Sequence, residues 1–185
     1  MIVFALTLSA NSQSDQDYLI KQNGDTISCI IGNISESGGN VVGIKYTDTE
    51  GNEVKIKGKS ECEKFKTIVT NGAIFDLVPL KASQPDGYKR HIWRKIDGKV
   101  KVYEYSNTIT NGVPGEWSST ATVTIYMVKL ENGKFYDINK SNFEKVLKPH
   151  FMHCKKFTEA YKGEYSSKQP IFEAIVKLYN ELCNE

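Results

Sequence analysis

Two histidines and a cysteine lie close together near the C-terminal end of the chain, in the order His150-x-x-His153-Cys154. Imidazole nitrogen and thiolate sulfur are ligands that zinc prefers, and on a continuous helix residues three apart share a face. The same residues could act as a thiol nucleophile and its base. A small hydrolase or a metal-binding protein is therefore one interpretation. Pro149 disfavours a continuous helix here, and the other interpretation is a pair of surface histidines beside a structural cysteine.

The cysteines offer a different role for Cys154. Both Cys154 and Cys183 fall in the predicted helical end of the chain. A disulfide between them would close a loop of about 30 residues and stabilise the fold by roughly 3–4 kcal/mol. Cys29 alternates with isoleucines on a predicted strand, which is typical of a small core residue. Cys62 can pair with Cys29 only if their Cα atoms come within about 7 Å.

Aromatic residues form a third candidate site. Trp93, Tyr103 and Tyr105 belong to a predicted hairpin, and Trp117 lies in a loop rich in glycine, proline and serine. Aromatic side chains offer an apolar face and a polar edge, so these four could form a platform for a sugar or a peptide. The alternative is that they fill the core of a small sheet. Trp117 is the one that we expect to be exposed.

Other catalytic motifs are incomplete. Gly58-Lys59-Ser60 resembles the end of a phosphate-binding loop, but Glu53 stands where that pattern requires glycine. The chain has no Gly-x-Ser-x-Gly motif, and no carboxylate pair for glycoside hydrolysis can be identified. An enzymatic activity is therefore uncertain, and the balance favours a protein without one. The sequence predicts no catalytic residue, no bound metal and no cofactor.

The first twelve residues differ from the rest of the chain. The segment from Ile2 to Leu8 is apolar and uncharged, and Ala10 and Ser12 have the spacing of a signal peptidase site. This pattern indicates that residues 1–12 are the remnant of a signal peptide, although the basic start of such a peptide is missing. The alternative is a buried first strand. We therefore expect export to the periplasm or to the cell exterior.

Charge and hydropathy limit the partners. The 185-residue chain has a net charge of +2, which predicts no binding to nucleic acid. No stretch approaches the ~20 apolar residues of a membrane helix, so no membrane span is expected. The partner is unknown, and the candidates are a carbohydrate, a peptide or an envelope protein. Self-association through an exposed sheet edge is a further possibility.

Short β-prone segments separated by glycine turns occupy most of the chain. Such turns recur about every dozen residues, and six of them contain Asn-Gly or Asp-Gly, a strong hairpin signal. The pattern predicts antiparallel β meanders or a small barrel. We divide this region into an N-terminal β sub-structure at 13–82 and a second antiparallel sub-structure at 83–140.

The remaining residues, 141–185, predict a helical cap. Ser141 and Glu144 fit a capping box at the start of the first helix, and Pro149 predicts a kink or a break. The fold class is therefore α+β, with C-terminal helices packed on antiparallel sheets. Four apolar residues at helical spacing are expected to face the sheets: Phe143, Ile175, Val176 and Tyr179.

Several of these segments together resemble a group of small exported proteins of Bacteroidota. The resemblance depends on Asn-Gly-Asp-Thr-Ile at 23–27, Asn-Gly-Lys-Phe at 132–135, Asn-Phe-x-x-Val-Leu at 142–147, and Tyr-Asn at 179–180 before Cys183. It implies export and one continuous fold, but no activity and no functional residues. Together with the incomplete motifs, it favours an exported non-catalytic module with a binding or structural role.

Overall fold

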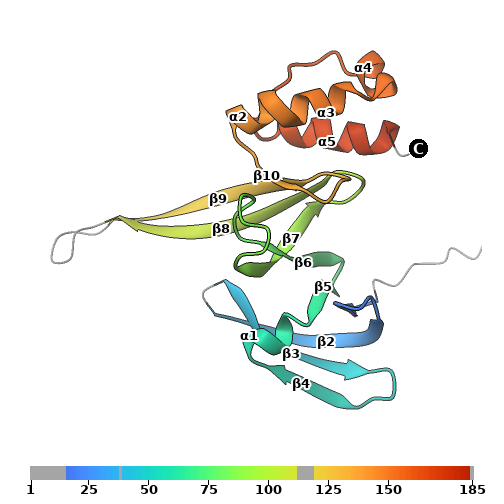
Figure 1. Ribbon diagram of the computed structural model, residues 1–185. Coiled ribbons are helices and arrows are strands. Elements are labelled where there is room, and N and C mark those ends of the chain that lie inside the picture. Colours follow the sequence, from blue (N-terminus) through green and yellow to red (C-terminus); the bar gives the residue numbers. More distant parts are fainter. Residues whose placement is uncertain (1–15, 38, 112–118, 184–185) are drawn as a thin grey trace, which may run out of the picture.

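The computed structural model describes residues 16–37, 39–111 and 119–183 (Figure 1). Within these ranges the β-strands come first along the chain, interrupted by one short helix, and the other helical elements follow. The strands are β1 (Tyr18–Lys21), β2 (Thr26–Ser37), β3 (Asn40–Asp48), β4 (Glu53–Lys57), β5 (Phe65–Thr70), β6 (Ala73–Pro79), β7 (Lys89–Ile96), β8 (Lys101–Asn111), β9 (Ser119–Lys129) and β10 (Phe135–Asp137). The helical elements are α1 (Lys59–Cys62), α2 (Lys140–Asn142), η1 (Phe143–Leu147), α3 (Lys148–Met152), α4 (Lys155–Ala160) and α5 (Ile171–Leu182).

All ten strands belong to one open antiparallel sheet with the order β10-β9-β8-β7-β6-β5-β1-β2-β3-β4. This confirms the α+β class, but the expected small barrel is wrong. A barrel requires the first and last strands of the sheet to pair, and here β10 and β4 lie at opposite ends of the order. The predicted sub-structures 13–82 and 83–140 meet inside the sheet, because β6 pairs directly with β7.

Local turn chemistry produces the hairpins. Between β5 and β6, Asn71 and Gly72 have φ values of +49° and +73°. Asparagine and glycine are the residues that tolerate this left-handed conformation, and such a turn matches the twist of the two strands. An Asn-Gly turn therefore joins β5 and β6 as a hairpin.

The helical region begins slightly earlier than expected. Its N-cap is Asn139, whose side chain accepts a hydrogen bond of 2.9 Å from the backbone N–H of Asn142. The predicted capping box of Ser141 and Glu144 is therefore wrong. Asn139 satisfies the same requirement, because an N-cap side chain has to accept from an otherwise unpaired N–H in the first turn.

Pro149 interrupts the hydrogen-bond pattern without ending the helix. Residues 143–147 form a π-helical turn, in which the N–H of Lys148 donates to the carbonyl of Phe143, five residues back. The chain then continues as α3, with Pro149 in its first turn. Proline lacks the N–H that an interior position would use, so a wider turn directly before it accommodates the missing donor.

The C-terminal helical elements, from α2 to α5, cover one face of the sheet over β7, β8 and β9, and they enclose the largest core (Figure 1). The four residues expected to face the sheets are buried there, which confirms the helical cap. Five aromatic rings dominate this core: Phe143, Phe151, Phe157, Phe172 and Tyr179. Val102 and Val128 provide the sheet side of the contact.

A second, smaller core lies among β1 to β5 and α1. It contains buried aliphatic side chains such as Leu19, Ile44 and Ile68, together with the thiols of Cys29 and Cys62. Both cysteines are free, so the conditional pairing between them is not made. They occupy the positions of small core residues, as Cys29 was expected to do.

A buried polar cluster connects the middle strands. Asp76 on β6 accepts hydrogen bonds from the Arg94 guanidinium at 2.7 Å, from the Tyr103 hydroxyl at 2.8 Å and from the Thr67 hydroxyl at 2.8 Å. Burial and the Asp76 carboxylate raise the pKa of the Tyr103 phenol. The hydroxyl therefore stays protonated and remains a donor to Asp76. Since every partner is satisfied, the cluster specifies how β5, β6, β7 and β8 align.

Candidate functional site

The three residues of the His-x-x-His-Cys motif do not form a common site. Cys154 is bonded to Cys183, and the Cα atoms are 6.4 Å apart. His153 donates from Nδ1 to the carbonyl of Pro149 at 2.8 Å, whereas Nε2 of His150 lies 3.9 Å from a carboxylate oxygen of Glu131. The disulfide removes the thiolate that Cys154 would have to supply for zinc binding or for nucleophilic attack.

The structure also separates the four aromatic residues. Tyr103 is 1% exposed and donates a hydrogen bond to Asp76, while Trp93 is 40% exposed. Tyr103 pairs with Arg94, the neighbour of Trp93, and successive residues of a strand point to opposite faces. Trp93 and Tyr103 therefore do not share a surface. Tyr105 is half-buried and donates to the carbonyl of Leu80.

Trp117 lies outside the described residues. The predicted platform is consequently wrong for the three aromatic residues that the structure describes. Their register, which a single sequence does not reveal, divides them between two faces of the sheet.

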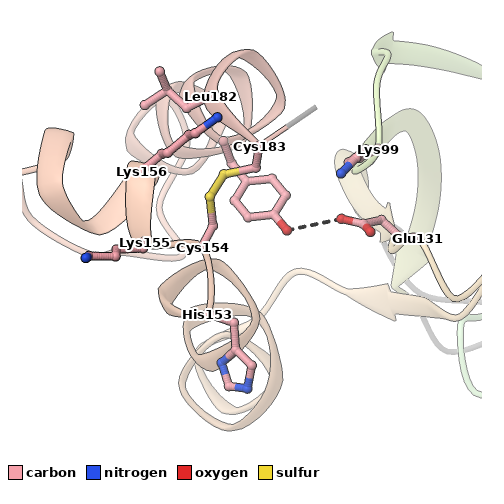
Figure 2. A pocket seen from close by; sticks show the side chains of 9 residues that line it. Lys99, Glu131, His153, Cys154, Lys155, Lys156, Leu182 and Cys183 are labelled. Atoms are coloured by element: carbon pink, nitrogen blue, oxygen red, sulfur yellow. Dashed lines mark hydrogen bonds between the residues drawn. A yellow bond between two sulfur atoms is a disulfide. The ribbon is translucent and has the colours of Figure 1, made fainter. Parts of the chain in front are cut away.

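A basin of about 340 Å³ lies instead at the disulfide (Figure 2). Four segments form its walls: the turn between β7 and β8, the turn between β9 and β10, the junction of α3 and α4, and the end of α5. Its lining consists of Lys99, Glu131, His153, Cys154, Lys155, Lys156, Tyr179, Leu182 and Cys183. We call it the disulfide basin.

The side chains of the basin differ in direction. Lys99 and Glu131 lie next to each other across from the disulfide, whereas His153 and Lys155 point away from it (Figure 2). Lys156 extends along the end of α5 toward Leu182 (Figure 2). The inner surface therefore combines an ammonium group, a carboxylate, a phenol and the apolar disulfide.

Asn180 attaches the end of α5 to the β7–β8 turn that carries Lys99. Its side-chain oxygen accepts from the N–H of Val100 at 2.9 Å, and its nitrogen donates to the carbonyls of Val100 and Asp97 at 2.7 and 2.9 Å. Gly98 permits this approach, because a Cβ there would lie 2.5 Å from the Asn180 amide carbon. Together with the disulfide, these contacts link three walls of the basin: the junction of α3 and α4, the end of α5 and the β7–β8 turn.

Tyr179 positions the carboxylate of Glu131. The phenol donates to Oε1 of Glu131 at 3.1 Å. Burial, and then the hydrogen bond to Glu131, raise the pKa of Tyr179 to about 12. The phenol is therefore protonated at neutral pH and keeps this donor role. Burial lowers the pKa of the neighbouring His150, although Glu131 opposes that effect, and the imidazole is favoured in its neutral form.

The sequence did not predict the basin, although three of its lining residues, His153, Cys154 and Cys183, were candidate residues. Lys99 and Glu131 directly flank the Asp-Gly and Asn-Gly turns, so their exposure at hairpin ends was foreseeable. Their proximity was not, because it depends on β7, β8, β9 and β10 being consecutive neighbours in the sheet.

A larger hollow of about 670 Å³ lies in the N-terminal half, where Asp17, Cys29, Asp48 and Asn71 contribute to its lining. Asp17 accepts hydrogen bonds from the N–H groups of Ile31 and Asn71. Burial raises the pKa of the Cys29 thiol to about 11. The thiol is therefore protonated at neutral pH, which argues against a nucleophilic role.

Comparisons with known proteins identify no relative: no family model, no curated protein and no solved structure matches the chain. The resemblance to small exported proteins therefore stays a prediction. Across the described ranges, no group of three His, Cys, Asp or Glu side chains could hold a metal ion. The helices of those ranges include none that is long and apolar enough to cross a membrane.

Proposed function

We propose that the protein is an exported, non-catalytic binding module whose disulfide basin takes a small ligand bearing a carboxylate. The observation that supports this proposal most directly is the charge of the basin. Its lining includes three lysines, Lys99, Lys155 and Lys156, and a single carboxylate, that of Glu131. Glu131 already accepts from Tyr179. The lining residues therefore have a net positive charge, with Lys99 on the inner surface across from the apolar disulfide (Figure 2), and this charge attracts an anion.

The construction of the basin supports binding. Its four walls are joined by the disulfide, by the three hydrogen bonds of Asn180 and by the Tyr179–Glu131 contact. A ligand that enters a preformed site loses less free energy to ordering the protein. A volume of about 340 Å³ matches a monosaccharide or a few atoms of a peptide terminus rather than a folded domain.

Two observations support export. The apolar segment before Ser12 has the pattern of a signal peptide. The Cys154–Cys183 disulfide is of the kind that persists in oxidising compartments such as the periplasm and the cell exterior. A structural role without a ligand is the alternative, and the binding experiment separates the two.

The test titrates the protein with a uronic acid and with a short peptide that ends in a free carboxylate, using NMR chemical shifts or calorimetry. The neutral sugar and the amidated peptide are the matched ligands without the charge. In the variant Lys99→Gln/Lys156→Gln, affinity for the charged ligand should fall by about tenfold or more, because charge-assisted hydrogen bonds are lost. Lys57→Gln/Lys66→Gln removes two exposed lysines from β4 and β5 and should change affinity little.

The outcomes are distinct. Absence of binding by either carboxylate would contradict the proposed ligand class. Equal weakening in both lysine variants would show a response to net charge alone and would contradict the assignment to the basin.

A further inference from the structure

The hairpin of β8 and β9 extends beyond both of its neighbours in the sheet. β7 pairs with β8 only as far as Glu104, and β10 pairs with β9 only between Met127 and Lys129. β8 and β9 continue to pair with each other as far as Asn111 and Ser119. Residues 105–111 and 119–125 therefore form a two-stranded ribbon that projects from the body of the molecule (Figure 1). We call this ribbon the arm.

The ends of the sheet are protected against pairing, and the arm is not. β4, at one end, carries Glu53, Lys55 and Lys57 in five residues. Glu53 forms ion pairs with Lys55 and with Lys45 on β3. β10, at the other end, has three residues. Charged side chains and short length are the usual means by which proteins prevent edge-to-edge association.

The two arm strands contain no lysine, arginine, aspartate or glutamate, although 25% of the chain is charged. Their composition is rich in β-branched residues: Thr108, Ile109, Thr110, Thr120, Thr122, Val123, Thr124 and Ile125. Such residues favour strands. A two-stranded ribbon is marginally stable by itself in water, and a third strand would stabilise it.

The two long edges of the arm differ. The edge of β8 lies on the side of the segment after β6, where the hydroxyl of Tyr105 donates to the carbonyl of Leu80. On the outer edge of β9, the last backbone hydrogen bond described runs from Ile138 N to Tyr126 O. Beyond it, residues 119–125 pair through the backbone only with β8 in the described part of the chain. Val123 on this strand is 40% exposed.

We propose that two copies of the chain associate through the outer edge of β9, residues 119–125, paired antiparallel about a two-fold axis. An antiparallel strand opposite an identical strand matches each free N–H to a carbonyl. No like charges meet at this contact, because the strand has none. The result is a four-stranded sheet built from two arms.

The symmetry favours a second copy as the occupant over an unrelated segment. The same edge serves both partners, so association uses up the exposed groups of both and stops at two copies. A dimer would also stabilise each arm, which has no third strand among the described residues of the chain. This inference does not depend on the ligand of the disulfide basin.

The experiment measures mass by size-exclusion chromatography with light scattering over a range of concentrations of the full chain. We expect a species of twice the 20.8 kDa chain mass that dissociates on dilution. In Thr122→Lys/Val123→Lys, which places one charge on each face of the strand, the dissociation constant should rise by about tenfold or more. Ile30→Lys/Asn33→Lys adds the same charge at exposed positions of β2 and should leave the dissociation constant unchanged.

Backbone hydrogen exchange tests the proposal on the unaltered chain, without a substitution that could disturb the fold. The amides of residues 119–125 should become more protected as concentration rises, while those of the outer strand β4 should not. A monomer at every concentration would overturn the proposal and leave pairing with another protein as the remaining use of the edge. A dimer unaffected by the arm charges, or an open-ended series of larger species, would overturn it as well.

Discussion

The two halves of the sheet are stabilised in different ways. Over β7, β8 and β9, helices from the far end of the chain bury a cluster of aromatic rings, and they are held by a disulfide and by Asn180. In the half formed by β1 to β5, hairpin neighbours and the short α1 enclose a smaller core that is mostly aliphatic and contains two free thiols. The helical half depends on a disulfide and on side-chain contacts between elements distant in sequence. The other half depends mainly on pairing between hairpin neighbours, with the pairing of β1 and β5 as the exception.

The difference explains where the candidate site lies. Asn180 contacts Val100, which is 80 residues away along the chain, and Tyr179 contacts Glu131 across 48 residues. Loop closure over such distances costs conformational entropy, and additional fixed contacts offset that cost. The disulfide basin is formed by these same contacts, so its shape and the attachment of the helices are one feature.

The largest expected effect comes from emptying the aromatic core. Phe151 is fully buried, and its ring lies 5.1 to 6.2 Å from those of Tyr179, Phe157 and Phe172. Phe151→Ala should lower the free energy of unfolding by about 3–5 kcal/mol, through lost burial and the cavity that remains.

The counterpart in the other half is Leu19→Ala, which should cost about 2–5 kcal/mol for the same reason. Both variants should shift a single urea transition, because β6 pairs with β7 and the Asp76 cluster spans them. Far-ultraviolet circular dichroism and tryptophan fluorescence would follow the unfolding transition. Two separate transitions would show that the halves unfold independently, and the two halves would then be separate folding domains.

The disulfide should have the next largest effect. Cys154→Ser/Cys183→Ser opens a link between residues 29 apart and should lower the free energy of unfolding by about 3–4 kcal/mol. Reductant should destabilise the unaltered protein by a similar amount and leave the double variant unchanged. If reductant destabilised both proteins equally, the loss of stability would not come from breaking the disulfide. The disulfide would then not account for the difference in stabilisation between the two halves.

A smaller effect concerns His91, which is buried between the halves and bonds to the carbonyl of Phe65 at 2.8 Å. Burial lowers the pKa of His91, although the Phe65 carbonyl and the carboxylates of Glu63 and Asp76 oppose this shift. As pH falls below the ordinary histidine value of about 6.5, the unfolded chain takes up the proton first. Stability that is present above that pH is therefore lost as the pH decreases.

His91→Gln can keep an N–H donor for Phe65 but cannot titrate. Urea unfolding at several pH values should show a flatter pH dependence for this variant, by at most about 1.4 kcal/mol per pH unit, the contribution of one proton. His150 is present in both proteins, so its contribution cancels. Parallel curves would mean that His91 titrates alike in the folded and unfolded chains, contrary to its burial.

Much of the local structure could be predicted from the sequence. The turns at Asn71-Gly72 and Asn132-Gly133 were identified because positive φ angles restrict the residue types that they accept. The buried face of α5 followed from the spacing of Ile175, Val176 and Tyr179. The pairing of Cys154 with Cys183 was a candidate because both cysteines fall in the predicted helical region, on either side of its last two segments.

Other features were decided only by the tertiary structure. An open sheet in place of a barrel, the separation of Trp93 from Tyr103, and the meeting of Lys99 with Glu131 all depend on strand order and register. The sequence by itself determined which segments turn, extend or coil, because those preferences arise between residues a few positions apart. Which surfaces then meet is set by packing between segments as far apart as Val100 and Asn180, and no local pattern carries that information.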